Sequence, residues 1–255
     1  MSSLLEASGI SVSFGGVRAV SEVDLRLDDG QCVGIIGPNG SGKTTFLNAV
    51  CGIVPASGRL LVEGRPIRLG RPKQARWAGI LRVFQAPQIY DNLTCIENVM
   101  LATDDRRGTG LFGGVLGRRS MIRRERARVE VGVEALRGVG LLPMAEQSAA
   151  RLSYGQRRLL EIARALSADP KILLLDEPSA GLNDAETRSL GDLLERLQGE
   201  GQAMVLVDHK VDFVDRICPR IMAMELGEKI AEGVPAEVWT NPRVADAYLG
   251  AVGDA

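Results

Sequence analysis

The stretch Gln31–Thr45, QCVGIIGPNGSGKTT, contains the features that decide the fold. Its first half is an apolar run that ends in glycine, which is typical of a strand buried on both faces of a sheet. Its second half fits the pattern G-x-x-x-x-G-K-[ST], and a helical pattern follows from about Lys43 to Cys51. A strand, a glycine-rich turn and a helix in this order predict a phosphate-binding loop in an α/β protein.

Each position of the glycine-rich loop has a distinct expected role in binding phosphate. Gly37, Gly40 and Gly42 let the backbone fold tightly, so that its N–H groups point towards phosphate oxygens. Lys43 brings a positive charge to the β- and γ-phosphates, and Thr44 offers its hydroxyl to Mg²⁺. A chance glycine loop is the alternative, but every fixed position of the pattern is present. The residues predicted to contact the nucleotide are Gly37, Pro38, Asn39, Gly40, Ser41, Gly42, Lys43, Thr44 and Thr45.

Three further apolar runs end in polar residues that suit phosphate chemistry. They are ILRVFQ, ending at Gln85, KILLLDE, ending at Asp176 and Glu177, and VLVDH, ending at His209. Ligands of parallel sheets bind at the carboxyl ends of strands, so these residues and Gly37 are expected to converge on one edge. Successive strand residues point in opposite directions. Asp176 therefore suits Mg²⁺ held through water, and Glu177 suits the general base or positions the attacking water. Solvated acids and a structural histidine are the alternatives.

The stretch LSYGQRRLLEIARAL, Leu152–Leu166, predicts a helix with a defined beginning. Ser153 and Gln156 fit the capping box S/T-x-x-E/Q. The apolar face of this helix is expected to comprise Leu159, Ile162, Ala163 and Leu166. A helix that begins with exposed N–H groups can bind an anion, and this stretch alone does not identify which one.

The alternation of apolar runs and helical patterns predicts an α/β fold with a mostly parallel sheet, an antiparallel β subdomain and an inserted α-helical subdomain. Residues 1–93 and 167–230 are expected to form the nucleotide-binding core, a P-loop NTPase fold, together with the β subdomain. Residues 94–166 are expected to form the helical subdomain, and residues 231–255 a C-terminal helical tail. The first thirty residues alternate in polarity and predict two antiparallel strands, with a further hairpin at residues 58–69.

Composition and charge exclude several classes of protein. The chain has 255 residues, of which 45% are hydrophobic and 25% charged, and its net charge is −1. This balance is typical of a soluble globular protein and gives no support for nucleic acid as a partner. The four cysteines are widely spaced, which favours buried thiols over disulfides or zinc. Neither a secretory signal nor a membrane span is predicted, so any membrane part must come from a partner.

One biased stretch, Asp104–Arg128, holds eight arginines and three acidic residues. Glycines in its middle favour a loop between helices. A solvated loop is one interpretation, and contact with a partner or with lipid headgroups is the other.

Six motifs occur in an order that resembles the ATP-binding cassette (ABC) ATPases. GPNGSGKTT resembles Walker A, VFQAP the Q-loop, LSYGQ the signature motif, ILLLDEP Walker B, SAGLND the D-loop and VDHK the H-loop. The match covers nearly the whole chain. A P-loop alone would also fit a kinase or a GTPase, whereas six motifs in this order are far more specific.

The resemblance implies that two cassettes pair head-to-tail with two ATP molecules between them. Ser153, Gly155 and Gln156 would then contact the γ-phosphate of the ATP held by the partner, which supplies the anion for the helix beginning. Gln85 would contact Mg²⁺ or the attacking water and relay closure to a membrane subunit, and His209 would contact the γ-phosphate.

Two more roles follow from the same resemblance. Phe14 is similar to the aromatic residue that stacks on adenine, although an ordinary strand residue is the alternative. Asp184 lies in the D-loop, which crosses the dimer interface in this family.

Finer features resemble the longer cassette of high-affinity branched-chain amino-acid importers. Tyr154 stands where most ABC proteins carry glycine, and the insert GLFGGVLGRRS and the ending NPRVADAYLG fit the same group. The implied partners are a second cassette, identical or similar, transmembrane permeases and, indirectly, a substrate-binding protein. The implied location is the cytoplasmic face of the inner membrane. Cassettes of urea importers and lipopolysaccharide exporters, and soluble ABC ATPases that do not drive transport, remain alternatives. A non-catalytic regulatory cassette would require loss of Glu177 or His209, and both are present.

Overall fold

The computed structural model describes residues 3–104 and 118–250, with side chains described in these ranges except at 104, 118–124, 249 and 250. The chain forms two compact units. The first comprises Met1–Gln85, Lys171–Ala180 and Thr187–Ala255, and the second comprises Ala86–Pro170 and Gly181–Glu186.

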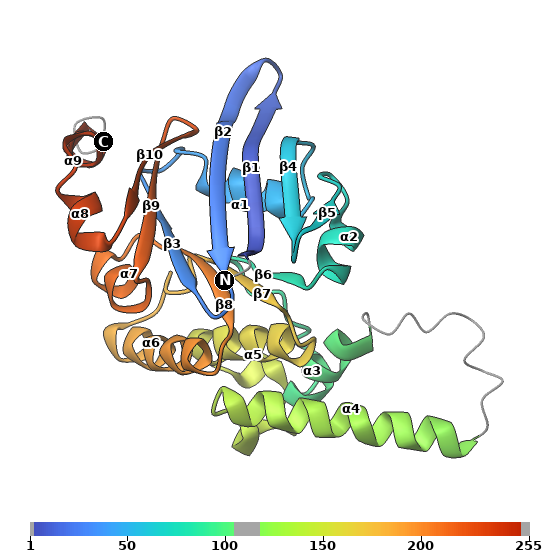
Figure 1. Cartoon of the computed structure of the whole chain (residues 1–255). Helices are drawn as coiled ribbons and strands as arrows, with labels where there is room; N and C mark the ends of the chain where they lie inside the picture. The colour runs from blue at the N-terminus through green and yellow to red at the C-terminus, as the bar shows by residue number, and fades with distance from the viewer. Residues whose placement is uncertain (1–2, 105–117, 251–255) are drawn as a thin grey trace. The chain divides into compact units, whose positions relative to one another are not determined.

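A four-stranded antiparallel sheet lies in the first unit, with the strand order β2-β1-β4-β5 (Figure 1). Its strands are β1 (Ser3–Phe14), β2 (Val17–Asp28), β4 (Ser57–Val62) and β5 (Arg65–Ile67). β1 pairs with β2 and β4, and β4 pairs with β5. The antiparallel pairing of the first thirty residues and the later hairpin are therefore confirmed.

The second sheet of this unit has six strands in the order β10-β9-β3-β8-β7-β6. Its strands are β3 (Cys32–Ile36), β6 (Ile80–Val83), β7 (Ile172–Asp176), β8 (Ala203–Val207), β9 (Arg220–Glu225) and β10 (Glu228–Gly233). Every neighbouring pair is parallel except β9 with β10. This architecture confirms the predicted α/β fold with a mostly parallel sheet and a separate antiparallel sheet.

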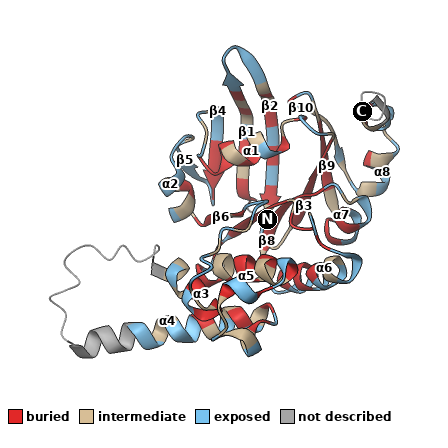
Figure 2. Ribbon diagram, turned by 180° about the vertical axis from the view of Figure 1, so that it is seen from behind, coloured by how far each residue is buried: buried red, intermediate tan, exposed pale blue. Residues whose placement is uncertain are grey.

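Burial follows the position of each strand in the six-stranded sheet. All residues of β3, β7 and β8 are buried, as the continuous apolar runs predict. Figure 2 shows the buried colour on β3 and on the neighbouring β9. The apolar run ILRVFQ likewise indicates a buried strand, and this expectation is only partly right. Leu81 and Arg82 of β6 are only partly buried as whole residues, because β6 lies at one edge of the sheet, although the side chain of Arg82 is itself buried.

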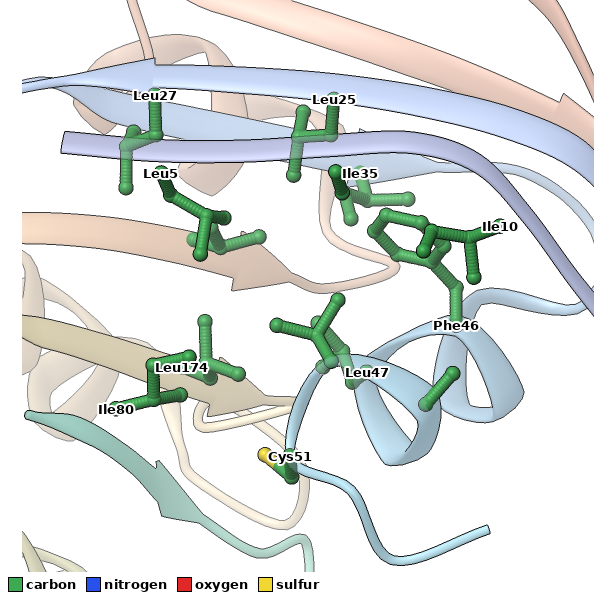
Figure 3. Packing of buried hydrophobic residues seen from close by; sticks show 14 of the residues in the cluster. Leu5, Ile10, Leu25, Leu27, Ile35, Phe46, Leu47, Cys51, Ile80 and Leu174 are labelled. Carbon is green, nitrogen blue, oxygen red and sulfur yellow. The ribbon is translucent and has the colours of Figure 1, made fainter. Parts of the chain in front are cut away.

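Helix α1 (Lys43–Val50) fills the space between the apolar faces of the two sheets of the first unit. Its Phe46 and Leu47 are fully buried and point towards Ile10 and Leu25 of the antiparallel sheet and Ile35 of β3 (Figure 3). The predicted helix after the glycine-rich loop is confirmed. The other helices of this unit are α2 (Pro72–Trp77), α7 (Val211–Ile217), α8 (Pro235–Trp239), α9 (Pro242–Gly250) and most of α6 (Asp184–Gly199).

The hairpin of β9 and β10 is a feature that the sequence analysis missed. Its turn, Leu226 and Gly227, has φ values of +46° and +85°, which is typical of a tight hairpin turn. Exposed and half-buried residues make up β10, so its sequence carries little alternation of polarity. Residues 231–233, placed in the C-terminal tail by the prediction, belong to this strand, and α8 and α9 follow it.

The second unit is helical. Its helices are α3 (Cys95–Asp104), α4 (Arg118–Gly138) and α5 (Tyr154–Ser167), with short 3₁₀ turns at Leu142–Met144 and Ala149–Arg151. The predicted apolar face of α5 is only partly right, because Ile162 and Ala163 are buried whereas Leu159 and Leu166 are half-buried. Arg158 and Glu161 are buried instead and form an ion pair at 2.8 Å, which lets two charged residues occupy the packed face.

Most of the arginine-rich stretch at 104–128 lies outside the described residues, so neither interpretation of it is tested. At its described end, Arg128 pairs with Glu125 at 3.2 Å and donates a hydrogen bond to the Met100 carbonyl. No helix among the residues that the structure describes has the length and apolar character needed to cross a bilayer.

Gly34 in β3 provides a test of the packing behind the glycine-rich loop. A Cβ atom there would lie 2.8 Å from Val214 Cγ1 and 2.9 Å from Ile221 Cγ2. We expect Gly34→Ala to lower the free energy of unfolding by about 1–3 kcal/mol through overpacking. Gly138→Ala is the matched control, because a Cβ atom at that helical glycine meets nothing within 4 Å. Chemical denaturation measures both variants, and equal stabilities would contradict this packing.

Candidate active site

The glycine-rich loop begins where β3 ends and is shaped by close contacts with its own unit. Gly37 has φ of +147°, and a Cβ atom there would lie 2.1 Å from the Met224 carbonyl oxygen. Gly42 has φ of +99°, and its Cβ would lie 2.6 Å from the Ala19 carbonyl oxygen. Glycine is therefore needed at both positions by backbone conformation and by space.

Lys43 is the cation of this loop. Its Nζ donates hydrogen bonds to the carbonyl oxygens of Gly37 and Pro38, each at 2.8 Å, and lies 3.4 Å from Ser41 Oγ. Burial lowers the pKa of the ammonium group, while the charges of Glu177 and Asp176 act in the opposite direction. A buried ammonium group in this position is suited to binding the phosphate groups of a nucleotide.

Asp176 is the last residue of β7 and is buried. Its Oδ1 lies 3.4 Å from Thr44 Oγ1, so two of the predicted Mg²⁺ residues are adjacent. Its Oδ2 accepts a hydrogen bond from Arg82, a residue that the sequence analysis did not identify. The sequence signal for Arg82 was a single basic residue inside an otherwise apolar strand.

Glu177 is held by two other predicted residues. Its Oε2 accepts a hydrogen bond from Gln85 Nε2 at 2.8 Å, and its Oε1 lies 2.8 Å from His209 Nε2. Its φ of +47° places it outside the strand. The two acids thus differ in direction because the chain turns after Asp176, and the predicted reason, alternation along a strand, is wrong.

Asp208 organises the loops beside this site and was missed by the sequence analysis. It is buried, and its carboxylate accepts hydrogen bonds from the N–H and hydroxyl of Ser179 and from the N–H groups of His209 and Lys210. The loops after β7 and β8 are therefore tied to one carboxylate, which fixes the start of the segment that carries His209.

Tyr248 was also missed as an individual residue, although it lies in the quoted C-terminal ending. Its hydroxyl accepts a hydrogen bond from Gly37 N–H at 2.9 Å. Its ring packs edge-on against Trp239, whose Nε1 donates to Asp215 of α7 at 2.9 Å. Burial raises the pKa of Tyr248, so the hydroxyl is protonated at neutral pH. The C-terminal helices therefore contact the beginning of the glycine-rich loop.

The remaining loop residues and Phe14 are open to solvent to different degrees. Asn39, Gly40 and Thr44 are exposed, whereas Pro38 and Thr45 are half-buried. Phe14 ends β1 with its side chain 49% exposed. Exposure leaves its ring accessible to a base, and its contact with adenine stays a prediction.

In the second unit, the predicted capping box of α5 is confirmed. Gln156 N–H donates to Ser153 Oγ at 3.2 Å, and Ser153 N–H donates to Gln156 Oε1 at 2.9 Å. A Cβ atom at Gly155 would lie 2.5 Å from Glu186 Oε1, and one at Gly181 would lie 2.9 Å from the Tyr154 ring. The D-loop therefore packs against the start of α5. The ATP contacts of Ser153, Gly155 and Gln156 stay predictions.

The same helix also holds the segment that follows Gln85 in sequence. Three residues of one face of α5 make the contacts: Arg157 pairs with Asp91 at 2.9 Å, Glu161 Oε1 accepts Gln88 N–H at 3.2 Å, and the Arg164 guanidinium lies 5.3 Å from the centre of the Tyr90 ring. Their spacing of four and three residues is that of a single helical face.

The oxygen donors of the first unit fit a hard divalent cation. Mg²⁺ prefers oxygen ligands and is usually bound by one or two carboxylates together with substrate phosphates. The Thr44 hydroxyl and the Asp176 carboxylate meet this requirement. No group of three or more His, Cys, Asp or Glu side chains suited to a metal occurs among the described residues.

Comparison with known proteins agrees with this geometry. A family profile described as "ABC transporter" matches residues 20–180, and one described as "Branched-chain amino acid ATP-binding cassette transporter" matches residues 228–254. The chain is 39% identical over 251 residues to a high-affinity branched-chain amino acid transport ATP-binding protein of Pseudomonas aeruginosa, covering 97% of this chain and 98% of that protein. A protein of the same description from Escherichia coli is 37% identical over 249 residues, with 97% and 98% covered.

Solved structures have the same fold. A nucleotide-free ATP-binding cassette from an ABC transporter superposes with a TM-score of 0.84 at 29% identity, covering 96% of this chain and 98% of that one. An ATP-binding cassette of an ABC transporter in its ADP conformation gives the same TM-score and identity, with 98% and 100% covered. A dimeric cassette in a post-hydrolysis state, bound to ADP and phosphate, gives 0.74 at 25% identity, with 91% and 98% covered.

Tyr248→Phe tests the contact between the C-terminal helix and the loop. The variant keeps the ring but leaves the Gly37 N–H without its acceptor, so we expect the free energy of unfolding to fall by about 0.5–1.5 kcal/mol. ATP affinity should fall by a few-fold, because the entry to the loop is less well fixed. Tyr90→Phe is the matched control, since the Tyr90 hydroxyl makes no hydrogen bond with any residue of the described ranges. Denaturation and ATP titration measure both, and equal results for the two variants would contradict the contact.

Proposed function

The chain belongs to the ATP-binding proteins of the branched-chain amino acid ABC transporter family, and from this premise we propose that it hydrolyses ATP to drive uptake of branched-chain or related amino acids through membrane permeases. The main support for this proposal is the pair of contacts that hold the Glu177 carboxylate. Its two carboxylate oxygens contact Gln85 and His209, while Lys43 lies close enough to interact with its charge. This arrangement suits attack of water on a phosphate.

Binding of ATP begins with the glycine-rich loop. Its backbone N–H groups and the Lys43 ammonium neutralise the phosphate oxygens, and Lys43 exchanges its bonds to the Gly37 and Pro38 carbonyls for bonds to phosphate. Mg²⁺, held by Thr44 directly, by Asp176 through water and by Gln85, would neutralise charge on the β- and γ-phosphate oxygens. The exposed Phe14 ring stacks on adenine.

Hydrolysis then requires an oriented water molecule. Glu177 accepts a proton from this water as its oxygen attacks the γ-phosphorus, and the bond from phosphorus to the β–γ bridging oxygen breaks, releasing ADP and phosphate. His209 holds Glu177 in place and contacts the γ-phosphate. Gln85 contacts the other carboxylate oxygen of Glu177, and from that side it responds to the γ-phosphate. Such positioning of a general base contributes about 10²–10⁴-fold to the rate.

The complete site requires a second cassette. A solved relative is a dimer bound to ADP and phosphate, which supports the same assembly for this chain. In this dimer the start of α5 binds the γ-phosphate held by the partner, through Ser153, Gly155 and Gln156. In the free chain the Ser153 hydroxyl caps α5. When the dimer closes, this hydroxyl gives up its capping hydrogen bond and contacts phosphate instead. A homodimer and a pair with a similar, shorter cassette both fit the sequence.

Membership of this family supports membrane permeases as partners. The curated relatives are described as ATP-binding proteins of high-affinity branched-chain amino acid transport. We place the chain at the cytoplasmic face of the inner membrane, against permeases that receive substrate from a binding protein. The segment held by α5, which includes Gln88, Tyr90 and Asp91, is exposed and suits contact with a permease.

Glu177→Gln tests this function. We expect ATP binding to persist and turnover to fall by about 10²-fold or more, because the amide cannot take the proton. ATP with Mg²⁺ should then convert the protein into a stable dimer in light scattering, while Glu200→Gln, at an exposed helix end, behaves as wild type. Normal turnover in Glu177→Gln would remove Glu177 from the mechanism. A variant that loses turnover yet stays monomeric with ATP would contradict the proposed assembly.

A further inference from the structure

Arg82 is a buried arginine on an edge strand, and neither the motifs nor the proposed mechanism gives it a role. Its side chain is 5% exposed. Nη2 donates to Asp176 Oδ2, Nη1 donates to Asn48 Oδ1, and the guanidinium carbon lies 4.8 Å from the centre of the Phe84 ring. Residues of α1, of β7 and of the segment just after β6 therefore hold the guanidinium group in one place.

The Asp176 carboxylate needs this partner. Its side chain is 4% exposed, and an ionised carboxylate buried to this degree is costly unless it is paired and hydrogen-bonded. Lys43 is the other cation close enough to act on its charge, but Lys43 Nζ donates to the backbone carbonyls of its own loop. Within the described part of the chain, Arg82 is the residue that forms an ion pair with Asp176.

The contact with Arg82 also assigns different partners to the two oxygens of Asp176. Oδ2 faces the guanidinium group, and Oδ1 lies 3.4 Å from Thr44 Oγ1. Thr44 and Asn48 are one turn apart on α1, so they share a helical face. Arg82 binds Asn48 and Asp176 together, and thereby sets the spacing between α1 and the end of β7, where the two proposed Mg²⁺ residues lie.

We propose that Arg82 is the built-in counter-ion and positioning residue of Asp176. It holds Oδ1 towards Thr44 before Mg²⁺ arrives, and it keeps Mg²⁺ from binding in the absence of nucleotide. The charges of Arg82 and Lys43 balance those of Asp176 and Glu177, so a bare divalent cation gains little, whereas ATP adds the negative charge that attracts it. This inference rests on the proposed assignment of Asp176 to Mg²⁺.

The first measurement is thermal unfolding of the full chain without nucleotide or metal. Arg82→Met should lower the melting temperature by about 5–15 °C, because it leaves a buried carboxylate unpaired. Arg65→Met, at an exposed strand residue, is the matched control and should change little. The double variant Arg82→Met/Asp176→Asn should recover part of the loss, since both charges are gone. Equal melting temperatures for the two single variants, or no recovery in the double variant, would overturn the pairing.

The second measurement adds millimolar Mg²⁺ alone, followed by excess chelator. Wild type should not respond, whereas Arg82→Met should gain several degrees that the chelator removes, because its site carries a net negative charge. Arg82→Gln keeps an N–H donor without the charge and replaces Arg82→Met if that variant does not fold. Its melting temperature should then rise with Mg²⁺ and fall again with chelator. Variants that fail to respond, or a wild type that responds equally, would overturn the role of Arg82 towards Mg²⁺.

These outcomes separate the inference from the function beneath it. If Mg²⁺ with ATP fails to stabilise wild type, the proposed nucleotide site is wrong. The change in melting temperature of Arg82→Met without metal still tests the ion pair independently. If Mg²⁺ with ATP stabilises wild type and Arg82→Met behaves as Arg65→Met, the function stands and the counter-ion role is overturned.

Discussion

The parallel pairing of β7 with β6 on one side and with β8 on the other is the constraint on which the active site depends. It brings the carboxyl ends of three strands to one edge, so that Gln85, Glu177 and His209 come within hydrogen-bond distance although they are far apart in sequence. The pairing of β8 with β3 adds the glycine-rich loop to the same edge. A shift in either register would separate Glu177 from the glycine-rich loop.

Charge balance is the second condition at this edge. Two carboxylates, Asp176 and Glu177, lie near two cations, Lys43 and Arg82. Lys43 is held by backbone carbonyls that phosphate oxygens can replace, whereas Arg82 is held by side chains behind the site. In the proposed mechanism, Lys43 is therefore the cation that moves onto the nucleotide, and Arg82 is the cation that stays with the protein.

The sequence predicted the residues whose role is local and missed those whose role depends on packing. The loop Gly37–Thr45 and the capping box of Ser153 and Gln156 are short patterns with a direct physical meaning, and both lie where expected. Arg82 acts through a carboxylate 94 residues away and Tyr248 through an amide 211 residues away, so no local pattern marks either. The β9–β10 hairpin was missed because β10 is half-exposed and its polarity does not alternate.

The proposed mechanism depends on the start of α5 on one chain meeting the glycine-rich loop of another when ATP binds. All four native cysteines are buried, so thiols introduced at exposed positions dominate cross-linking. Asn39→Cys and Ser153→Cys would be made in separate Glu177→Gln chains, which are then mixed and oxidised with or without ATP and Mg²⁺. We expect a disulfide between the two chains that requires both variants and ATP. A disulfide that forms equally without ATP, or no disulfide while ATP is bound, would contradict it.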